Sequence, residues 1–209
     1  PHHRFPMILL VLATLLCLAT ASAPPAGRLS WALEVGPGLI GIAILIATYR
    51  RFPFSHWVYG GVFLHLLILI YGGYYTYALT PLGDWARDAF GLARNHYDRI
   101  GHLALGVFPA FVVRELLLRL TPLRRGAWLY FLVCCVVLAI GAFWELLEWW
   151  TTLLVAPDVG DAFLGSQGDP WDAQWDMFLA LVGAALALPL LSRAHDASLR
   201  ADQGQEHVP

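Results

Sequence analysis

Six ionisable residues recur at helical spacing in three apolar segments of the chain. They come from "NHYDRIGH", "FWELLEWW" and "DPWDAQWDM" and are, in order, Asp98, His102, Glu145, Glu148, Asp172 and Asp176. The members of each successive pair are three or four residues apart, which on a helix places both side chains on one face. We call this set the acid layer. Five carboxylates and one imidazole facing each other could bind a cation, share protons or neutralise an arginine.

A divalent metal site is the first chemistry that these residue types suggest. Oxygen-rich ligand sets with one histidine suit a hard or borderline ion such as Mg²⁺, Mn²⁺ or Zn²⁺. The expected ligands are His102, Glu145, Asp172 and Asp176. Glu148 or Asp98 would then act as a catalytic general base. No established metalloenzyme spacing such as H-E-x-x-H is present, so the assignment depends on the clustering alone.

Helix capping is the competing explanation for part of this pattern. Asp169 before Pro170, with Asp172 two residues later, is typical of a helix start, and Asp98 could cap its own helix in the same way. Glu148 lies next to two tryptophans and could reach the lipid head groups. Capping leaves Glu145 and Asp176 unexplained, because each lies a turn deeper. A buried carboxylate without a partner would cost several kcal/mol or protonate.

The loop before the last apolar segment is expected to close over the acid layer. Its sequence, "APDVGDAFLGSQGD", holds Phe163 and Leu164 between glycines that permit tight turns. Phe163, Gln167 and Asp169 are the residues expected to form this lid or to contact a substrate. Asp169 would also start the helix that follows.

Composition indicates the kind of protein that positions these residues. The 209-residue chain is 58% hydrophobic and only 13% charged, and its mean hydropathy is +0.61. Soluble domains carry about a quarter charged residues, so we expect an integral membrane protein. A net charge of −2 without a basic stripe argues against a nucleic-acid partner. The three cysteines lie inside apolar runs and are expected to be inert packing residues.

The predicted fold is an all-α, polytopic transmembrane bundle forming one domain over residues 1–209. The six expected spans are 6–23, 34–49, 55–79, 98–119, 126–150 and 172–192, each close to the roughly 20 helical residues that cross a bilayer. The first span is expected to be retained, although a signal peptide ending at Ala21-Ser22-Ala23 is the alternative. The polar tail 193–209 is predicted to be disordered.

Arginine placement predicts the orientation. Eight arginines fall on one side of the six-span arrangement: Arg4, Arg50, Arg51, Arg119, Arg124, Arg125, Arg193 and Arg200. The positive-inside rule therefore places both termini in the cytoplasm. Counted from Gly126 at about 1.5 Å per residue, Glu145 lies roughly 28 Å along its span, near the outer boundary. The acid layer is thus expected just inside the outer face.

The same motifs resemble a known family. "NHYDRIGHLALG", "FWELLEWW" and "FLGSQGDPWDAQWDM" are similar to the YjdF-like bacterial inner-membrane proteins, whose function is unsettled. The resemblance runs from the second span to the sixth and implies a multi-pass protein of the bacterial inner membrane. A looser similarity links the paired acids to VanZ-like membrane proteins. The long "GDAFLGSQGD" segment departs from that looser pattern, so the glycopeptide-resistance association of some VanZ-like proteins is not transferred.

Three functions remain open from the sequence. The first is a metal-dependent hydrolase or transferase acting on a lipid or lipid-linked head group at the outer leaflet, with membrane lipids as its surroundings. The second is a proton- or cation-coupled transporter, for which His65 and the Arg114-Glu115 pair are the only hints of an inward path. The third is a non-catalytic scaffold whose polar layer fixes helix packing. The sequence indicates neither the substrate nor the oligomeric state.

Overall fold

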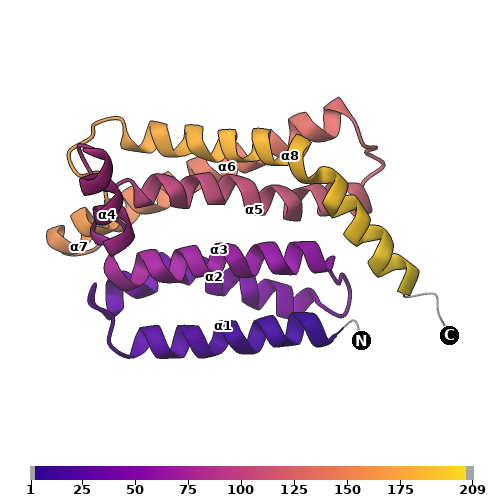
Figure 1. The fold of residues 1–209 in the computed structure, drawn as a ribbon, viewed down its shortest axis with the longest axis horizontal. Coiled ribbons are helices and arrows are strands. Elements are labelled where there is room, and N and C mark those ends of the chain that lie inside the picture. The colour runs from indigo at the N-terminus through magenta and orange to yellow at the C-terminus, as the bar shows by residue number, and fades with distance from the viewer. Residues whose placement is uncertain (1–2, 206–209) are drawn as a thin grey trace.

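The computed structural model describes residues 3–205, and within that range all regular structure is helical. Figure 1 shows six long helices and three short ones. Their bounds are α1 (Arg4–Ser22), α2 (Arg28–Thr48), α3 (His56–Tyr75), η1 (Tyr77–Leu79), α4 (Pro81–Phe90), α5 (Tyr97–Leu120), α6 (Ala127–Thr152), α7 (Pro157–Leu164) and α8 (Asp172–Gln205). The all-α prediction is confirmed.

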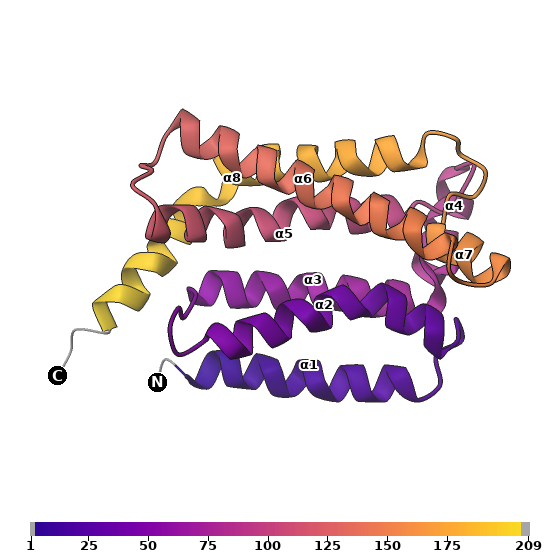
Figure 2. The same ribbon diagram turned by 180° about the vertical axis from the view of Figure 1, so that it is seen from behind.

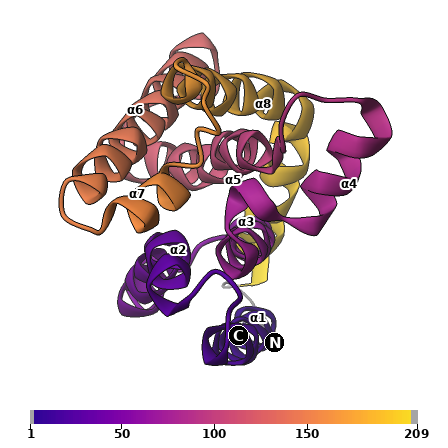
Figure 3. The same cartoon turned by 90° about the vertical axis from the view of Figure 1, so that its left-hand side faces the viewer.

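Five of the six long helices are long and apolar enough to cross a membrane: α1, α2, α3, α6 and α8. Helix α5 is as long but carries five charged residues, Asp98, Arg99, Arg114, Glu115 and Arg119. It packs against α3, α6 and α8 and lies at the centre of the bundle in the end-on view (Figure 3). Asp98, Arg114 and Glu115 are buried against other helices, which is where such residues are tolerated, whereas Arg119 is exposed near the end of α5.

The bundle has two halves joined through α3 and α5. Helices α1, α2 and α3 form one half, and α5, α6 and α8 form the other (Figures 1 and 2). The backbones of α5 and α8 are in direct contact. A β-carbon added at Gly106 would overlap the carbonyl oxygen of Ala180, and one at Gly183 would overlap that of Leu103. Small residues allow this approach, as is common between membrane helices.

The two ends of the bundle differ. The described chain begins and ends at the same end of the bundle, and α4 and α7 lie at the opposite end (Figure 1). The starts of α5 and α8 and the end of α6 meet beside α4 and α7, so the acid layer lies at that end.

The disordered tail predicted from residue 193 is wrong for residues 193–205, which continue α8 as a helix. Its polar side chains pair with the rest of the protein. His195 is fully buried against Glu115, and Asp196 pairs with Arg125 at 3.0 Å. These partners make the polar contacts that water would make in a disordered tail. The polar composition of residues 193–205 alone predicts such a tail. Residues 206–209 lie outside the described residues.

Candidate functional site

The acid layer is buried where three helices meet. Helix α5 contributes its first turns, α6 its last turns and α8 its first turns. The exposed fractions are small: Asp98 8%, His102 4%, Glu148 6%, Asp172 7% and Asp176 2% for the whole residue, and 10% for the Glu145 side chain. The helical spacing therefore does bring the predicted residues to one level, in the interior of the bundle.

Three of these residues form a compact group that could hold a metal ion. Asp98, His102 and Asp176 each offer one ligand atom, and these atoms lie within 4.8 Å of one another. His102 Nε2 is 3.6 Å from Asp98 Oδ1 and 3.7 Å from Glu145 Oε1. These separations exceed a hydrogen bond. They fit ligand atoms arranged around one shared cation. Such a cation binds each oxygen or nitrogen ligand at about 2.0–2.6 Å.

Buried atoms without partners mark the same place. Three of the eight buried side-chain atoms without a hydrogen-bond partner among residues 3–205 belong to the acid layer: Asp176 Oδ1, Glu145 Oε1 and His102 Nδ1. Most buried polar atoms in proteins are satisfied, and an unsatisfied one is commonly explained by an ion or a water. Two of these three atoms are carboxylate oxygens in a group of acids, where a cation or a shared proton could be the partner.

Asp172, one of the expected ligands, has a different partner. Its Oδ1 accepts a hydrogen bond from Arg94 Nη1 at 2.6 Å, and both side chains are nine-tenths buried. Arg94 comes from the loop before α5, and its role was not foreseen, because a loop arginine reaches the layer only through the fold. Asp98, expected as a general base, instead joins the three-residue group.

A second arginine completes the charge pairing on this side. Arg99 Nη2 lies 2.6 Å from Asp169 Oδ2, and Arg94 Nη1 lies 3.6 Å from the same oxygen. Two arginines thus offset Asp169 and Asp172. Within the part of the chain that the structure describes, neither Asp176 nor Glu148 forms an ion pair with an arginine.

Glu148 and a further acid border the group. Glu148 Oε1 accepts a hydrogen bond from Trp144 Nε1 at 2.7 Å. Glu34 on α2 is only 4% exposed and lies close enough to Asp98 and Glu148 for their charges to interact. The sequence did contain a signal for Glu34, since it is the first acidic residue of the chain and the next is Asp84.

Tyr77, in the η1 turn, also lies at this site. Its ring packs so closely on Gly72 and Gly101 that a side chain at either glycine would meet it. Burial, followed by the nearby carboxyl of Glu34, raises the pKa of the Tyr77 hydroxyl well above its ordinary value. The hydroxyl therefore stays protonated and can donate a hydrogen bond. Nothing in the local sequence distinguishes Tyr77 from its tyrosine neighbours in "YGGYYTY".

The loop between α6 and α8 covers the site. Phe163 is 5% exposed and its ring centroid lies 6.0 Å from that of Trp144. Gln167 exchanges two hydrogen bonds with the backbone of Asn95, at 3.1 and 2.8 Å. Arg94 donates to the carbonyl oxygens of Gly165 and Ser166. Asp169 Oδ1 accepts from the Trp171 amide at 3.0 Å and so caps the entry to α8.

Comparison with known proteins shows which family the chain belongs to. Residues 5–197 match the family model described as "Predicted membrane protein (DUF2238)". The chain belongs to this family. It is 47% identical to the inner membrane protein YjdF of Escherichia coli (strain K12) over 173 residues. The aligned region covers 83% of this chain and 82% of that protein. The resemblance to YjdF-like proteins is thereby confirmed. No solved structure matches.

Membership in DUF2238, a family described as predicted membrane proteins, agrees with the candidate membrane-spanning helices of the structure. A YjdF-like relative in the inner membrane and five candidate spans identify this chain as an integral membrane protein. The family description gives a membrane protein and names no chemistry for the acid layer.

Proposed function

We propose that the acid layer binds one divalent cation and uses it to hydrolyse or transfer a lipid or lipid-linked head group. The observation that carries this proposal is the group of Asp98, His102 and Asp176, with Glu145 beside it and two carboxylate oxygens left without partners. Three protein ligands and an open position are typical of catalytic metal sites.

Charge balance supports a cation. Glu34, Asp98, Glu145, Glu148 and Asp176 are buried close together, and the two arginines of the site are taken by Asp169 and Asp172. Like charges at such distances repel strongly in a medium of low dielectric constant. A divalent ion would remove most of that repulsion, and shared protons would remove the rest.

The surrounding residues suit chemistry on an anionic head group. A bound divalent ion would polarise a phosphoryl or ester oxygen and activate a water molecule. In hydrolysis the water oxygen attacks phosphorus, and the bond from phosphorus to the alcohol oxygen breaks. In this proposal Glu148 would take the proton from water and return it to the leaving oxygen. Arg99, which is partly exposed and pairs with Asp169, would be available to an anionic head group.

The transporter alternative has less support. A second polar cluster around Glu115 and His195 lies towards the other end of α5 and α8. Between the clusters, however, α5 is apolar from Leu103 to Val113, and α8 from Met177 to Leu191. The two helices are also in backbone contact there, at Gly106 and Gly183. An ion pathway along this interface would have to separate them.

Metal analysis of the purified protein tests the proposal. We expect about one divalent ion per chain after loading with Mn²⁺, Zn²⁺ or Mg²⁺, and at least a tenfold loss of affinity in Asp176→Asn and His102→Gln. Asp88→Asn is the matched control, since Asp88 is an exposed acid at the same end. Loaded protein is then incubated with vesicles of bacterial phospholipids, and released head groups are measured.

Two results would count against the proposal. Absence of bound metal in the wild type under all three loadings would favour the scaffold. Metal binding that is unchanged in both layer variants would place the ion elsewhere.

A further inference from the structure

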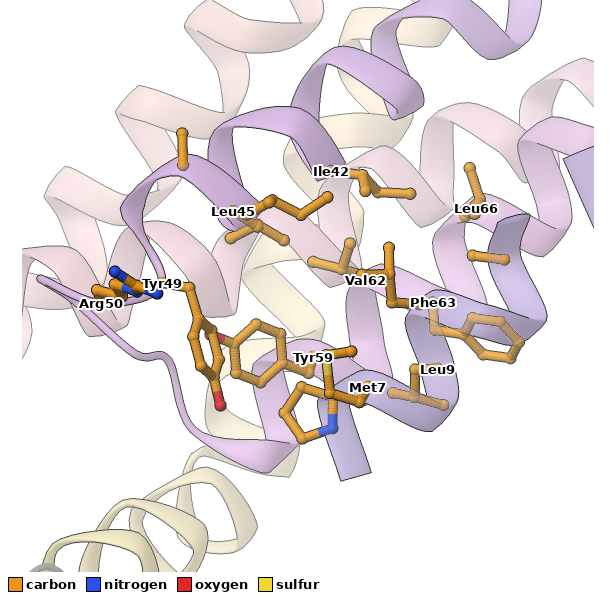
Figure 4. Close-up of a pocket in the computed structure, with 15 residues that line it drawn as sticks. Met7, Leu9, Ile42, Leu45, Tyr49, Arg50, Tyr59, Val62, Phe63 and Leu66 are labelled. Atoms are coloured by element: carbon orange, nitrogen blue, oxygen red, sulfur yellow. The ribbon is translucent and has the colours of Figure 1, made fainter. Parts of the chain in front are cut away.

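A groove opens between α1 and α2 at the end of the bundle remote from the acid layer. Its volume is about 420 Å³, within the usual range for ligand pockets. Figure 4 shows its lining: Leu9 and Met7 come from α1, Ile42 and Leu45 from α2, and Val62 and Leu66 from α3. These six are apolar, and the Tyr59 hydroxyl beside them already accepts a hydrogen bond from the Phe54 amide.

Contacts between α1 and α2 bound the groove at both ends: a small core near the turn that joins the helices, and the His3–Tyr49 hydrogen bond at the other end. Ala13 and Cys17 of α1 and Trp31 and Val35 of α2 share the small core near the turn. Between these contacts α3 forms the floor of the groove. Pro37 lies inside α2, where a missing backbone donor permits a bend.

One end of the groove is polar and positively charged. Tyr49 and Arg50 lie at this end in Figure 4, and the Tyr49 hydroxyl is hydrogen-bonded to His3 at 2.8 Å. Arg4 and Arg51 are neighbours of these residues in the sequence. All three arginines are exposed, and among residues 3–205 none of them forms an ion pair.

The N-terminal part of the chain supplies few acids to balance these arginines. Across residues 1–55 the sole acidic residue is Glu34, which lies sixteen residues from Arg50 and belongs to the opposite end of α2. An apolar slot inside the membrane with free arginines at the interface fits a molecule with a hydrocarbon tail and an anionic head.

We propose that this groove binds one acyl chain of an anionic phospholipid, whose head group pairs with Arg50 and its arginine neighbours. The leaflet is the one at the end where both termini lie. Arginine placement predicts that this is the cytoplasmic leaflet. The site is independent of the acid layer, because it lies at the opposite end of the bundle and shares no residue with it.

The test counts lipids that stay bound to the full chain. Detergent-solubilised protein is mixed with equal amounts of phosphatidylglycerol and phosphatidylcholine with identical acyl chains, and bound lipids are counted by native mass spectrometry. We expect the first lipid retained to be phosphatidylglycerol. Arg50→Gln should reduce its preference about fivefold, the change expected for one arginine near the head group. Arg124→Gln is the control, since Arg124 is an exposed arginine outside the groove.

A second pair of variants tests the groove itself. Val62→Trp fills the slot from its floor and should reduce retention of both lipids, whereas Leu64→Trp on the exposed face of α3 should not. Gel filtration and circular dichroism confirm that each variant is folded. Equal retention of the two lipids by the wild type would overturn the proposal. So would matching retention by Val62→Trp and Leu64→Trp.

Discussion

Arg94 Nη1 lies 2.6 Å from Asp172 Oδ1, and this buried ion pair joins the loop before α5 to the first turn of α8. Arg94 also donates to the carbonyl oxygens of Gly165 and Ser166 in the covering loop. One side chain therefore connects the two helix starts of the acid layer and the loop above them. It also pairs one carboxylate oxygen of Asp172, an expected metal ligand, with an arginine.

Replacing Arg94 by glutamine should destabilise the protein. The change leaves Asp172 buried without its partner, and breaking a buried pair in this way costs about 3–5 kcal/mol. Thermal unfolding in detergent measures the loss. Arg87→Gln removes an exposed pair at the same end and should cost at most about 1 kcal/mol. An Arg94→Met, Asp172→Leu double variant should regain much of the lost stability, and failure to do so would show that the loop contacts of Arg94 matter more.

Asp176→Asn should raise the thermal stability of metal-free protein and abolish stabilisation by metal. Removing one charge from a group of repelling acids is expected to contribute about 1 kcal/mol, or roughly 2–4 °C in a chain of this size. A cation that binds the wild type at 100 times its Kd adds about 2.7 kcal/mol, which the variant should not gain. Unfolding is followed with EDTA and with Mn²⁺. Equal metal responses in both proteins would contradict the site.

Gln167→Ala should loosen the covering loop without unfolding the bundle. The variant loses both hydrogen bonds to the Asn95 backbone, each contributing about 0.5–1.5 kcal/mol. Hydrogen exchange in residues 157–169 should then speed up several-fold while α5 stays protected. Unchanged exchange in the loop would mean that Phe163 and Arg94 hold it alone.

Gly106→Ala should separate α5 from α8. The added methyl group overlaps the carbonyl oxygen of Ala180, which belongs to rigid backbone, so we expect a loss of about 1–3 kcal/mol. Gly41→Ala on α2 is the matched control, because nothing lies within 4 Å of its added carbon. That variant should be neutral or more stable by up to about 1 kcal/mol, as alanine is the better helix former. Both values come from thermal unfolding.

Topology can be read from reporters that are active only in the periplasm. A fusion after Arg200 should be silent, because arginine placement predicts a cytoplasmic C-terminus. An insertion after Leu154, an exposed residue at the end of α6, should be active. The reverse pattern would invert the bundle and place the acid layer at the cytoplasmic face.

Sequence alone was sufficient for the membrane class, the long apolar helices and the level of the acids. Apolar length determines where a helix can cross, and spacing of three or four residues determines which side chains share its face, so Asp98 and His102 or Asp172 and Asp176 had to point together. The resemblance to YjdF-like proteins depended on the same local motifs.

Tertiary structure decided which charges meet. Arg94, Glu34 and Tyr77 come from a loop, a distant helix and a short turn, and their places depend on how α2, α5 and α8 pack. Packing likewise keeps residues 193–205 helical, through partners such as Glu115 for His195. Helical periodicity depends on the sequence of one segment. The partner of a buried charge instead depends on which other segment the fold brings within about 3 Å of it. For that reason Asp172 pairs with an arginine, while Asp98 joins the group that could hold a metal ion.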